Sequence, residues 1–266
     1  MMISKKVVVI GAGAAGLMAG ATAALYGASV TIIEKNKRVG RKIMITGKGR
    51  CNLANNCDVQ TFINNVPVNG RFLYSAINAF TPEDTIEFFE SKGLKTKTER
   101  GNRVFPASDK SVDVVDTMHD YAVESGCKIV CDTANALILE DGAVIGVKCE
   151  ENTYYADSVI ICCGGKSYPL TGSTGDGYTL AKQAGHTIVP LKPSLVPFTS
   201  GDKQCKDMQG LALKNVALRI VDKNSKKAVY SDFGEMLFTH FGMSGPMILS
   251  ASSHIRDIQP DRYKIG

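Results

Sequence analysis

Three glycines and one acid near the start of the chain have the spacing of a nucleotide-binding motif. Gly11, Gly13 and Gly16 form G-x-G-x-x-G, and Glu34 follows at the distance expected of the motif's acid. The first glycine permits a tight turn, the second lets backbone approach a pyrophosphate, and the third lets a helix pack closely on a strand. A carboxylate at Glu34 would accept hydrogen bonds from ribose hydroxyls and repel a 2′-phosphate, which favours FAD or NAD over NADP.

The pattern around these residues predicts the elements that must position them. Residues 7–10 and 29–33 are short apolar runs rich in β-branched residues, typical of strands buried on both faces. Between them, residues 14–26 are predicted to form a helix. Its first N–H groups, at Ala14 and Ala15, would face the phosphates. This βαβ context favours dinucleotide binding over a purely structural glycine-rich helix, and the interrupting glycines argue against a membrane span.

A basic segment follows the acid directly. From Asn36 to Arg50 there are six basic residues and no acidic one. We interpret this segment as an irregular loop that wraps a polyanion and contacts the cofactor. The alternative is a solvated or RNA-facing patch, although the segment has no interleaved aromatics for base stacking. The residues predicted to contact the cofactor here are Lys35, Arg41, Lys42, Gly47, Gly49, Arg50, Cys51 and Asn52.

A second glycine-rich region lies between residues 157 and 184. It is predicted to be a strand over 157–163, a loop, and a helix over 176–184. Its glycines would let backbone approach a ligand, and Asp176 could cap the helix or accept a hydrogen bond from a ribityl hydroxyl. The alternative is an ordinary strand-to-helix loop. The predicted ligand contacts are Gly164, Gly165, Thr174, Gly175, Asp176 and Gly177.

Composition limits the remaining possibilities. The net charge of +5 over 266 residues is modest and does not by itself indicate nucleic-acid binding. The eight cysteines include no C-x-x-C pair, so we expect reduced thiols, a cytoplasmic protein and no metal site. Three prolines, Pro190, Pro193 and Pro197, fall within eight residues and indicate a domain boundary. We therefore predict a dinucleotide-binding domain over 1–189, with a small antiparallel β insertion, and an incomplete β-rich domain over 190–266.

Several longer motifs occur in a fixed order along the chain: GAGAAG, GRKIMITGKGRCNLAN, CGGKSYPLTGSTGDGYTLAKQAGH, LVPF and GEMLFTHFGMSGPMILSAS. Together they resemble the bacterial FAD-dependent oxidoreductases described as aminoacetone-oxidase-like or NAD(P)/FAD-dependent, which include bile-acid-type enone reductases. The resemblance implies an α/β fold: a three-layer, Rossmann-like, two-dinucleotide-binding FAD domain with the start of an inserted β-rich domain. Full-length members continue well beyond residue 266, so we expect this chain to be their N-terminal part.

The resemblance also implies roles for single residues. Glu34 would hold the adenosine ribose, and a residue near Asn135 would touch adenine through its backbone. Arg41, Lys42 and the loop 47–52 would line the FAD phosphates and approach the flavin. Gly164-Gly165 and Gly175–Gly177 would lie along the FAD path.

The implied activity is hydride transfer from NADH or NADPH through FAD to an electron-poor small molecule such as an enone. The nicotinamide would bind transiently, because the chain has no second G-x-G-x-x-G. No nucleic-acid or membrane partner is expected, and the oligomeric state is open. The alternatives are a non-catalytic or NAD-only dinucleotide-binding protein and a nucleic-acid binder using the loop 36–50.

No catalytic residue is assigned from the sequence. Arg50 could lower the pKa of Cys51, but a buried structural thiol is the favoured interpretation. His240 is also more typical of a structural residue, and Tyr168 is a weaker candidate for a proton donor.

Overall fold

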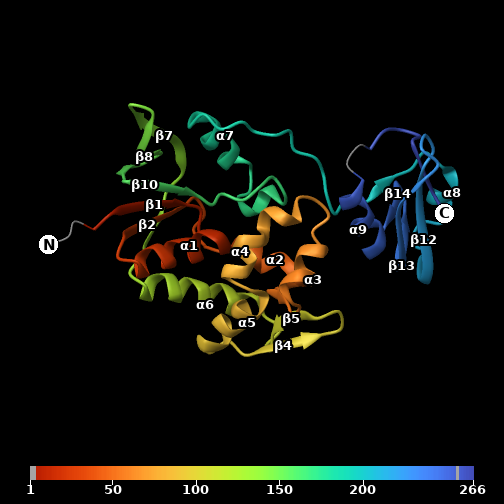
Figure 1. The fold of residues 1–266 in the computed structure, drawn as a ribbon, viewed down its shortest axis with the longest axis horizontal. Helices are drawn as coiled ribbons and strands as arrows, with labels where there is room; N and C mark the ends of the chain where they lie inside the picture. Colours follow the sequence, from red (N-terminus) through yellow and green to blue (C-terminus); the bar gives the residue numbers. More distant parts are fainter. Residues whose placement is uncertain (1–3, 256–257) are drawn as a thin grey trace. The chain divides into compact units, whose positions relative to one another are not determined.

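The computed structural model describes residues 4–255 and 258–266, which group into two compact units (Figure 1). The first unit contains the residues up to 62 and 74–188. The second contains 63–73 and 189–266. In the described residues, no helix is long and apolar enough to cross a membrane.

A parallel four-stranded sheet forms the centre of the first unit. Its strand order is β10 (Ser158–Ile161), β1 (Lys6–Ile10), β2 (Ser29–Glu34) and β6 (Lys128–Cys131). Successive side chains of a strand point to opposite faces. Val9 and Ile32 therefore enter one core, and Val8, Ile10 and Ile33 enter another on the other side. Burial on both faces explains why these strands are apolar along their length.

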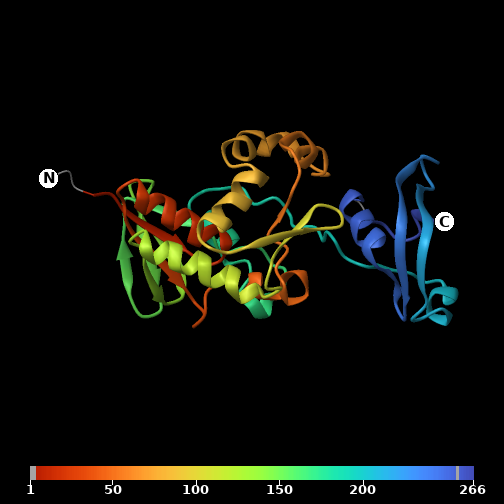
Figure 2. The same ribbon diagram turned by 90° about the horizontal axis from the view of Figure 1, so that it is seen from below.

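One face of this sheet is covered by α1 (Ala14–Leu25) and α6 (Ser111–Glu124), which lie side by side (Figure 2). Gly20 brings α1 close to the sheet: a Cβ placed there would lie 2.7 Å from Cδ1 of Ile32. The other face carries the antiparallel strands β7 (Ala134–Glu140), β8 (Ala143–Cys149) and β9 (Thr153–Tyr155), together with α7 (Asp176–Gln183). The predicted fold class, a Rossmann-like α/β fold with a parallel sheet, is confirmed.

The segment after β2 corrects one prediction. Residues 36–50 do not form a loop throughout, because α2 spans Arg41–Ile45 and the short 3₁₀ helix η1 spans Thr46–Gly49. Gly40 precedes α2 with a φ of 66°, and a Cβ there would lie 2.8 Å from the methyl groups of Val115 on α6. The helix contains no buried residue, so the sequence lacked the amphipathic pattern that would have indicated it.

Shorter elements complete the first unit and flank its central sheet. The strands β3 (Ala54–Asn55), β5 (Arg103–Pro106) and β4 (Thr96–Glu99) form a small antiparallel sheet in that order. The helices are α3 (Val59–Asn64), which crosses the unit boundary, α4 (Tyr74–Ala79), α5 (Pro82–Ser91) and the 3₁₀ helix η3 (Pro169–Thr171). A capping box between Thr81 and Asp84 starts α5.

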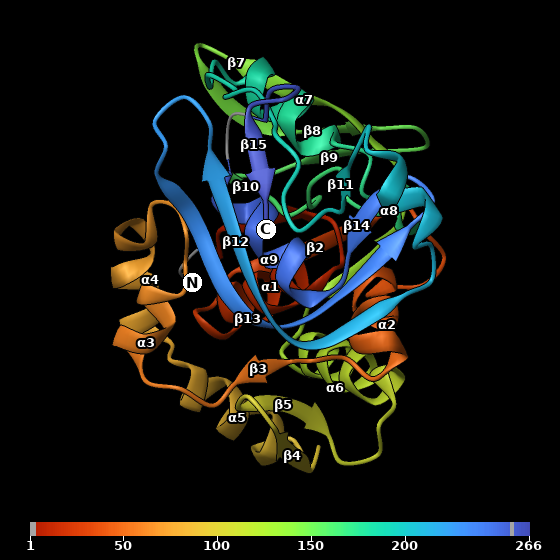
Figure 3. The same cartoon turned by 90° about the vertical axis from the view of Figure 1, so that its right-hand side faces the viewer.

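The second unit contains a five-stranded antiparallel sheet (Figure 3). Its order is β11 (Phe198–Thr199), β14 (Gly242–Ser244), β13 (Ala228–Thr239), β12 (Ala212–Asp222) and β15 (Tyr263–Ile265). The helices α8 (Lys203–Asp207) and α9 (Pro246–His254) belong to the same unit, as does the 3₁₀ helix η2 (Gly70–Leu73). Ile220, Met236 and Ile248 are among the residues that form its core.

Candidate dinucleotide site

A cavity of about 890 Å³ lies in the first unit, where β1, β2 and β10 end. Ligands of open α/β sheets bind at this carboxyl edge. The cavity brings together residues from the glycine turn, the acid, the basic segment and the second glycine-rich region. Of the residues predicted from the sequence, it is lined by Gly11, Gly13, Ala14, Ala15, Glu34, Lys35, Arg41, Lys42, Cys51, Asn52, Gly164 and Asp176.

The other predicted residues do not line the cavity: Gly16, Gly47, Gly49, Arg50, Asn135, Gly165, Thr174, Gly175 and Gly177. Asn135 is exposed at a β-bulge in β7, and the chain reaches the cavity through Asp132, Thr133 and Ala134 instead. Gly177 packs against β10, where a Cβ would lie 3.1 Å from a methyl group of Ile161.

The three motif glycines have different surroundings. A Cβ on Gly11 would lie 2.6 Å from the carbonyl oxygen of Cys162, and Gly11 has a φ of +102°. A Cβ on Gly16 would lie only 1.7 Å from the carbonyl oxygen of Gly11. Gly13 has an ordinary φ of −83°, and a Cβ there would meet nothing within 4 Å. Gly11 and Gly16 thus serve the packing of the turn, whereas Gly13 leaves open space at the cavity wall.

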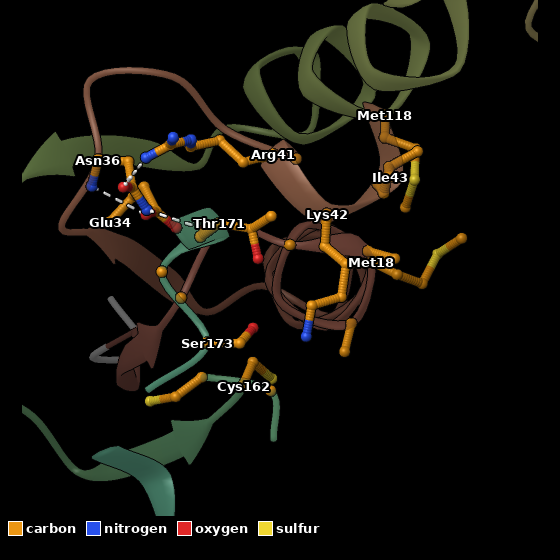
Figure 4. A pocket seen from close by; sticks show the side chains of 18 of the residues that line it. Met18, Glu34, Asn36, Arg41, Lys42, Ile43, Met118, Cys162, Thr171 and Ser173 are labelled. Atoms are coloured by element: carbon orange, nitrogen blue, oxygen red, sulfur yellow. Dashed lines mark hydrogen bonds between the residues drawn. The ribbon is translucent and has the colours of Figure 1, made fainter. Parts of the chain in front are cut away.

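Glu34 organises the centre of the cavity through both carboxylate oxygens (Figure 4). Oε2 accepts a 2.8 Å hydrogen bond from the backbone N–H of Ala12, inside the glycine turn. Oε1 accepts bonds from the backbone N–H of Asn36 at 2.9 Å and from its side-chain Nδ2 at 2.6 Å. Asn36 Oδ1 in turn accepts a 2.6 Å bond from Arg41 Nη1. One network therefore joins the acid, the turn and the basic segment.

Lys42 differs from the other cations of this segment. Across 4–255 and 258–266, its ammonium has no hydrogen-bond or ion-pair partner. Figure 4 shows its side chain running from α2 past the end of α1 toward Ser173 and Cys162. A Cβ on Gly164 would lie 3.7 Å from Lys42 Nζ and 3.0 Å from Ser173 Oγ, so the ammonium and the hydroxyl converge there. The site thus presents a cation and a hydroxyl beside a helix N-terminus, which suits a phosphate group.

Lys35 and Asp176 tie the two glycine-rich regions together. Lys35 Nζ donates to Asp176 Oδ2 at 2.6 Å and to Thr174 Oγ1 at 2.7 Å. Burial alone would raise the pKa of Asp176, but the hydrogen bonds from Lys35 and Thr174 outweigh burial and lower it. Asp176 is therefore an anion already paired with Lys35, which gives it a role in joining β2 to the start of α7.

Arg50 points to carboxylates rather than into the cavity. Its guanidinium donates to both oxygens of Glu99 at 2.8 and 3.0 Å and to Asp109 at 3.0 Å, and it lies 4.0 Å from the ring centre of Phe105. The hydrogen bonds with Glu99 raise the pKa of Arg50 and lower that of Glu99. This cluster attaches the basic segment to the β3–β5–β4 sheet.

The thiol of Cys51 is not activated by its neighbour. Burial raises its pKa, in spite of a hydrogen bond with Thr46 that acts in the opposite direction. Cys51 lies in the cavity wall with a φ of +61°, at the end of a turn in which Gly47 and Lys48 are also left-handed. These features support the structural interpretation of Cys51 over that of a reactive thiol.

Asp132 shapes one end of the cavity. It is 5% exposed and accepts hydrogen bonds from the backbone N–H groups of Thr133, Glu151 and Asn152. Burial alone would raise its pKa, but these bonds outweigh burial and lower it. The carboxylate joins the turn after β6, which lines the cavity, to the turn between β8 and β9.

Sequence reasoning missed several residues of the cavity. Asn36 and Ser173 are polar residues without a recognised motif, although Asn36 lies two residues after the acid. The apolar wall comes from distant elements and contains Leu53, Phe89, Val114 and Met118. No local motif showed that α5 and α6 meet this cavity. Tyr168 lies outside the cavity, and His240 belongs to the second unit.

Comparison with known proteins identifies the family. A model of the HI0933-like protein Rossmann domain matches residues 5–251. The chain belongs to this family. The resemblance to FAD-dependent oxidoreductases that the ordered motifs indicated is thereby confirmed at the level of the family.

Two curated relatives of this chain are named as enzymes. The 3-dehydro-bile acid delta(4,6)-reductase of Clostridium scindens is 31% identical over 250 residues, which cover 93% of this chain and 59% of that protein. The ribosomal RNA dihydrouridine synthase of Haemophilus influenzae is 30% identical over 253 residues, which cover 93% of this chain and 61% of that protein. A structure of the Mycobacterium smegmatis Sdh1 complex is similar in fold, with 20% identity, a TM-score of 0.50, and coverage of 82% of this chain and 41% of that one.

Proposed function

We propose that the chain binds FAD in the cavity at the carboxyl edge of its parallel sheet. The observation that carries the proposal is the pairing of an open Gly13 with an unpaired Lys42 ammonium beside the N-terminus of α1. A pyrophosphate needs a close approach to backbone N–H groups and a positive charge, and this part of the cavity offers both. Glu34 would accept hydrogen bonds from the adenosine ribose, for which its network with Asn36 orients it.

The two ends of the cavity suit the two ends of this cofactor. The turn over 132–134 would contact adenine through its backbone, as was expected of Asn135. In the opposite direction, Cys51, Asn52 and the apolar wall with Met118 would surround the start of the flavin. Thr174 would act from behind the wall, since it does not line the cavity but donates a hydrogen bond to Asp176, which does.

We further propose that the flavin serves an NADH- or NADPH-driven reduction of an electron-poor carbon–carbon double bond. Bound flavin supplies hydride chemistry, and the protein supplies position and electrostatics. The two curated relatives support this class, because a bile-acid dienone and a uridine ring both contain a double bond conjugated to a carbonyl. Adding one hydride and one proton across that bond is a two-electron reduction. The chain spans about three-fifths of the length of each of those relatives. We propose a small molecule as its substrate.

The rRNA-modifying relative supports a second candidate, reduction of a nucleobase in RNA. The basic segment 36–50 would then be expected to face the RNA. Its cations are divided, however: Arg50 is paired with Glu99 and Asp109, and Lys42 turns into the dinucleotide cavity. This division favours the small-molecule candidate, because a polyanion track needs several cations on one face.

An absorption spectrum of the purified chain with added FAD tests the cofactor. We expect a perturbed flavin band near ~450 nm and an affinity for FAD that falls at least about tenfold in Lys42→Met, since one charge-assisted bond is lost. Lys37→Met is the matched control, because Lys37 is exposed and does not line this cavity. Absence of FAD uptake, or equal affinity in both variants, would refute the assignment.

The substrate candidates are separated by anaerobic assays. Enzyme reduced with NADPH is mixed with a steroid dienone or with a uridine-containing RNA, and reoxidation of the flavin is recorded. Reoxidation by the dienone alone supports the small-molecule candidate. Reoxidation by the RNA alone overturns it.

A further inference from the structure

A second cavity, of about 590 Å³, lies beside the first within the same unit. It is formed by residues of α2 and the segment before it, including Arg38, Arg41 and Ile45, and by the η3 turn, including Tyr168 and Leu170. Arg41 and Thr171 line both cavities. Its volume is within the usual range of small-molecule sites, about 300–1,000 Å³. A ligand here would therefore lie next to whatever fills the first cavity.

The charged residues that line this cavity are all basic. Two guanidinium groups line it, and none of its lining residues is acidic. Arg41 gives one N–H to Asn36, whereas Arg38 has no partner among the residues that the structure describes. Guanidinium groups bind phosphate oxygens in a bidentate manner. The cavity is therefore suited to a ligand that carries phosphate.

The rest of the wall is apolar and unusually exposed. Tyr168 is 67% exposed and Leu170 is 89% exposed. Tyr168 has a left-handed backbone, with φ 54° and ψ 64°, and its carbonyl oxygen accepts hydrogen bonds from the backbone N–H of Thr171 and from Thr171 Oγ1. A left-handed conformation is unfavourable for a residue with a side chain and often occurs at functional sites. This turn presents one aromatic ring and one leucine to a flat ligand.

We propose that this second cavity binds the reduced nicotinamide dinucleotide, with phosphates on Arg38 and Arg41 and one planar ring against Tyr168 and Leu170. The inference rests on the proposed function, in which FAD fills the first cavity. The electron donor then needs a separate site beside the first cavity, and this cavity shares Arg41 and Thr171 with it. A dinucleotide with two to four negative charges matches two arginines, whereas an RNA strand would need a longer basic track.

The test compares Arg38→Ala and Tyr168→Ala with Lys37→Ala, and Tyr168→Phe serves as the conservative variant. Dissociation constants for NADPH and NADH are measured by titration on the chain with and without FAD, and the FAD constant is measured separately. We expect NADPH binding to weaken at least about tenfold in Arg38→Ala and Tyr168→Ala, which corresponds to 1.4 kcal/mol. FAD binding should change less than twofold, and Tyr168→Phe and Lys37→Ala should resemble the parent. Thermal unfolding of each variant checks that it folds.

The outcomes separate this inference from the proposed function. FAD binding with unaltered NADPH affinity in Arg38→Ala overturns the second site and leaves the first. NADPH binding that depends on Arg38, in a chain that takes up no FAD, supports the second site and overturns the first assignment. Displacement of NADPH by FAD in competition would place both in one cavity and overturn the inference. Arg38-dependent binding of an RNA oligonucleotide without NADPH binding would overturn it in favour of an RNA contact.

Discussion

Gly13 and Gly16 lie three positions apart, yet alanine should affect different properties at the two positions. We expect Gly16→Ala to lower stability and Gly13→Ala to lower the affinity for FAD. In Gly16→Ala the new Cβ lies 1.7 Å from the carbonyl oxygen and 2.9 Å from the carbonyl carbon of Gly11. These are backbone atoms of the turn, so they cannot move aside as a flexible side chain would. Overpacking of this kind costs at least about 3 kcal/mol of folding free energy. That cost lowers the melting temperature of a domain of this size by roughly 6–12 °C.

In Gly13→Ala the new Cβ meets nothing within 4 Å, and the φ of −83° suits alanine. Gly13 is the N-cap of α1, where glycine is preferred to alanine, so we expect a loss of about 1 kcal/mol or less. The methyl group, however, occupies the space that a pyrophosphate would need beside the helix. FAD affinity should fall at least about tenfold, or 1.4 kcal/mol.

The assay pairs thermal unfolding without cofactor with a titration of FAD followed by flavin fluorescence. The expected result is a stable Gly13→Ala variant that binds FAD poorly and an unstable Gly16→Ala variant. Gly27→Ala is the control for destabilisation outside the site, because Gly27 has a φ of +88°, where alanine is strained, and does not line the cavity. Parent-like FAD affinity in Gly13→Ala would show that no phosphate approaches this glycine.

Three further predictions concern the walls of the site. In Gly172→Ala the new Cβ lies 2.5 Å from Asn36 Nδ2 at a φ of +100°, so FAD affinity should fall by about tenfold or more, as measured by the same titration. Arg50→Ala should lower the urea midpoint at pH 7. Because Arg50 lowers the pKa of Glu99, this stabilisation is present above the ordinary carboxyl pKa and is lost as the pH falls, so parent and variant should converge below about pH 4. Burial raises the pKa of Cys163 to about 11, so mass spectrometry should find its alkylation by iodoacetamide at pH 7.5 slower than that of a free thiol by on the order of a hundredfold.

The sequence predicted the parts of the site in which local chemistry determines position. The strand, turn, helix and acid of residues 7–34 could be predicted because the glycine spacing and the apolar runs that determine them lie within about thirty residues of sequence. The resemblance implied an adenine contact near Asn135, and the cavity is lined by the neighbouring residues 132–134. A bulge at Ala134/Ala136 shifts the register there, and no sequence signal marked it.

The basic segment shows why the rest could not be predicted. Its six cations looked equivalent in the sequence, but their surroundings in the structure differ. Arg50 finds Glu99 and Asp109, which are 49 and 59 positions away. Such long-range pairs follow from how the β4–β5 hairpin folds back, which composition does not reveal.

Lys42 differs from Arg50 in having no such partner among the described residues. Lys42 has no carboxylate within reach in the described chain, although it lines a cavity with Glu34 and Asp176. Those two acids already accept hydrogen bonds, from Ala12 and Asn36 in one case and from Lys35 in the other. An ammonium that pairs with neither acid is available to an anionic group of a ligand. This is why the cavity indicates an anionic cofactor more strongly than the glycine motif alone, which constrains only the backbone.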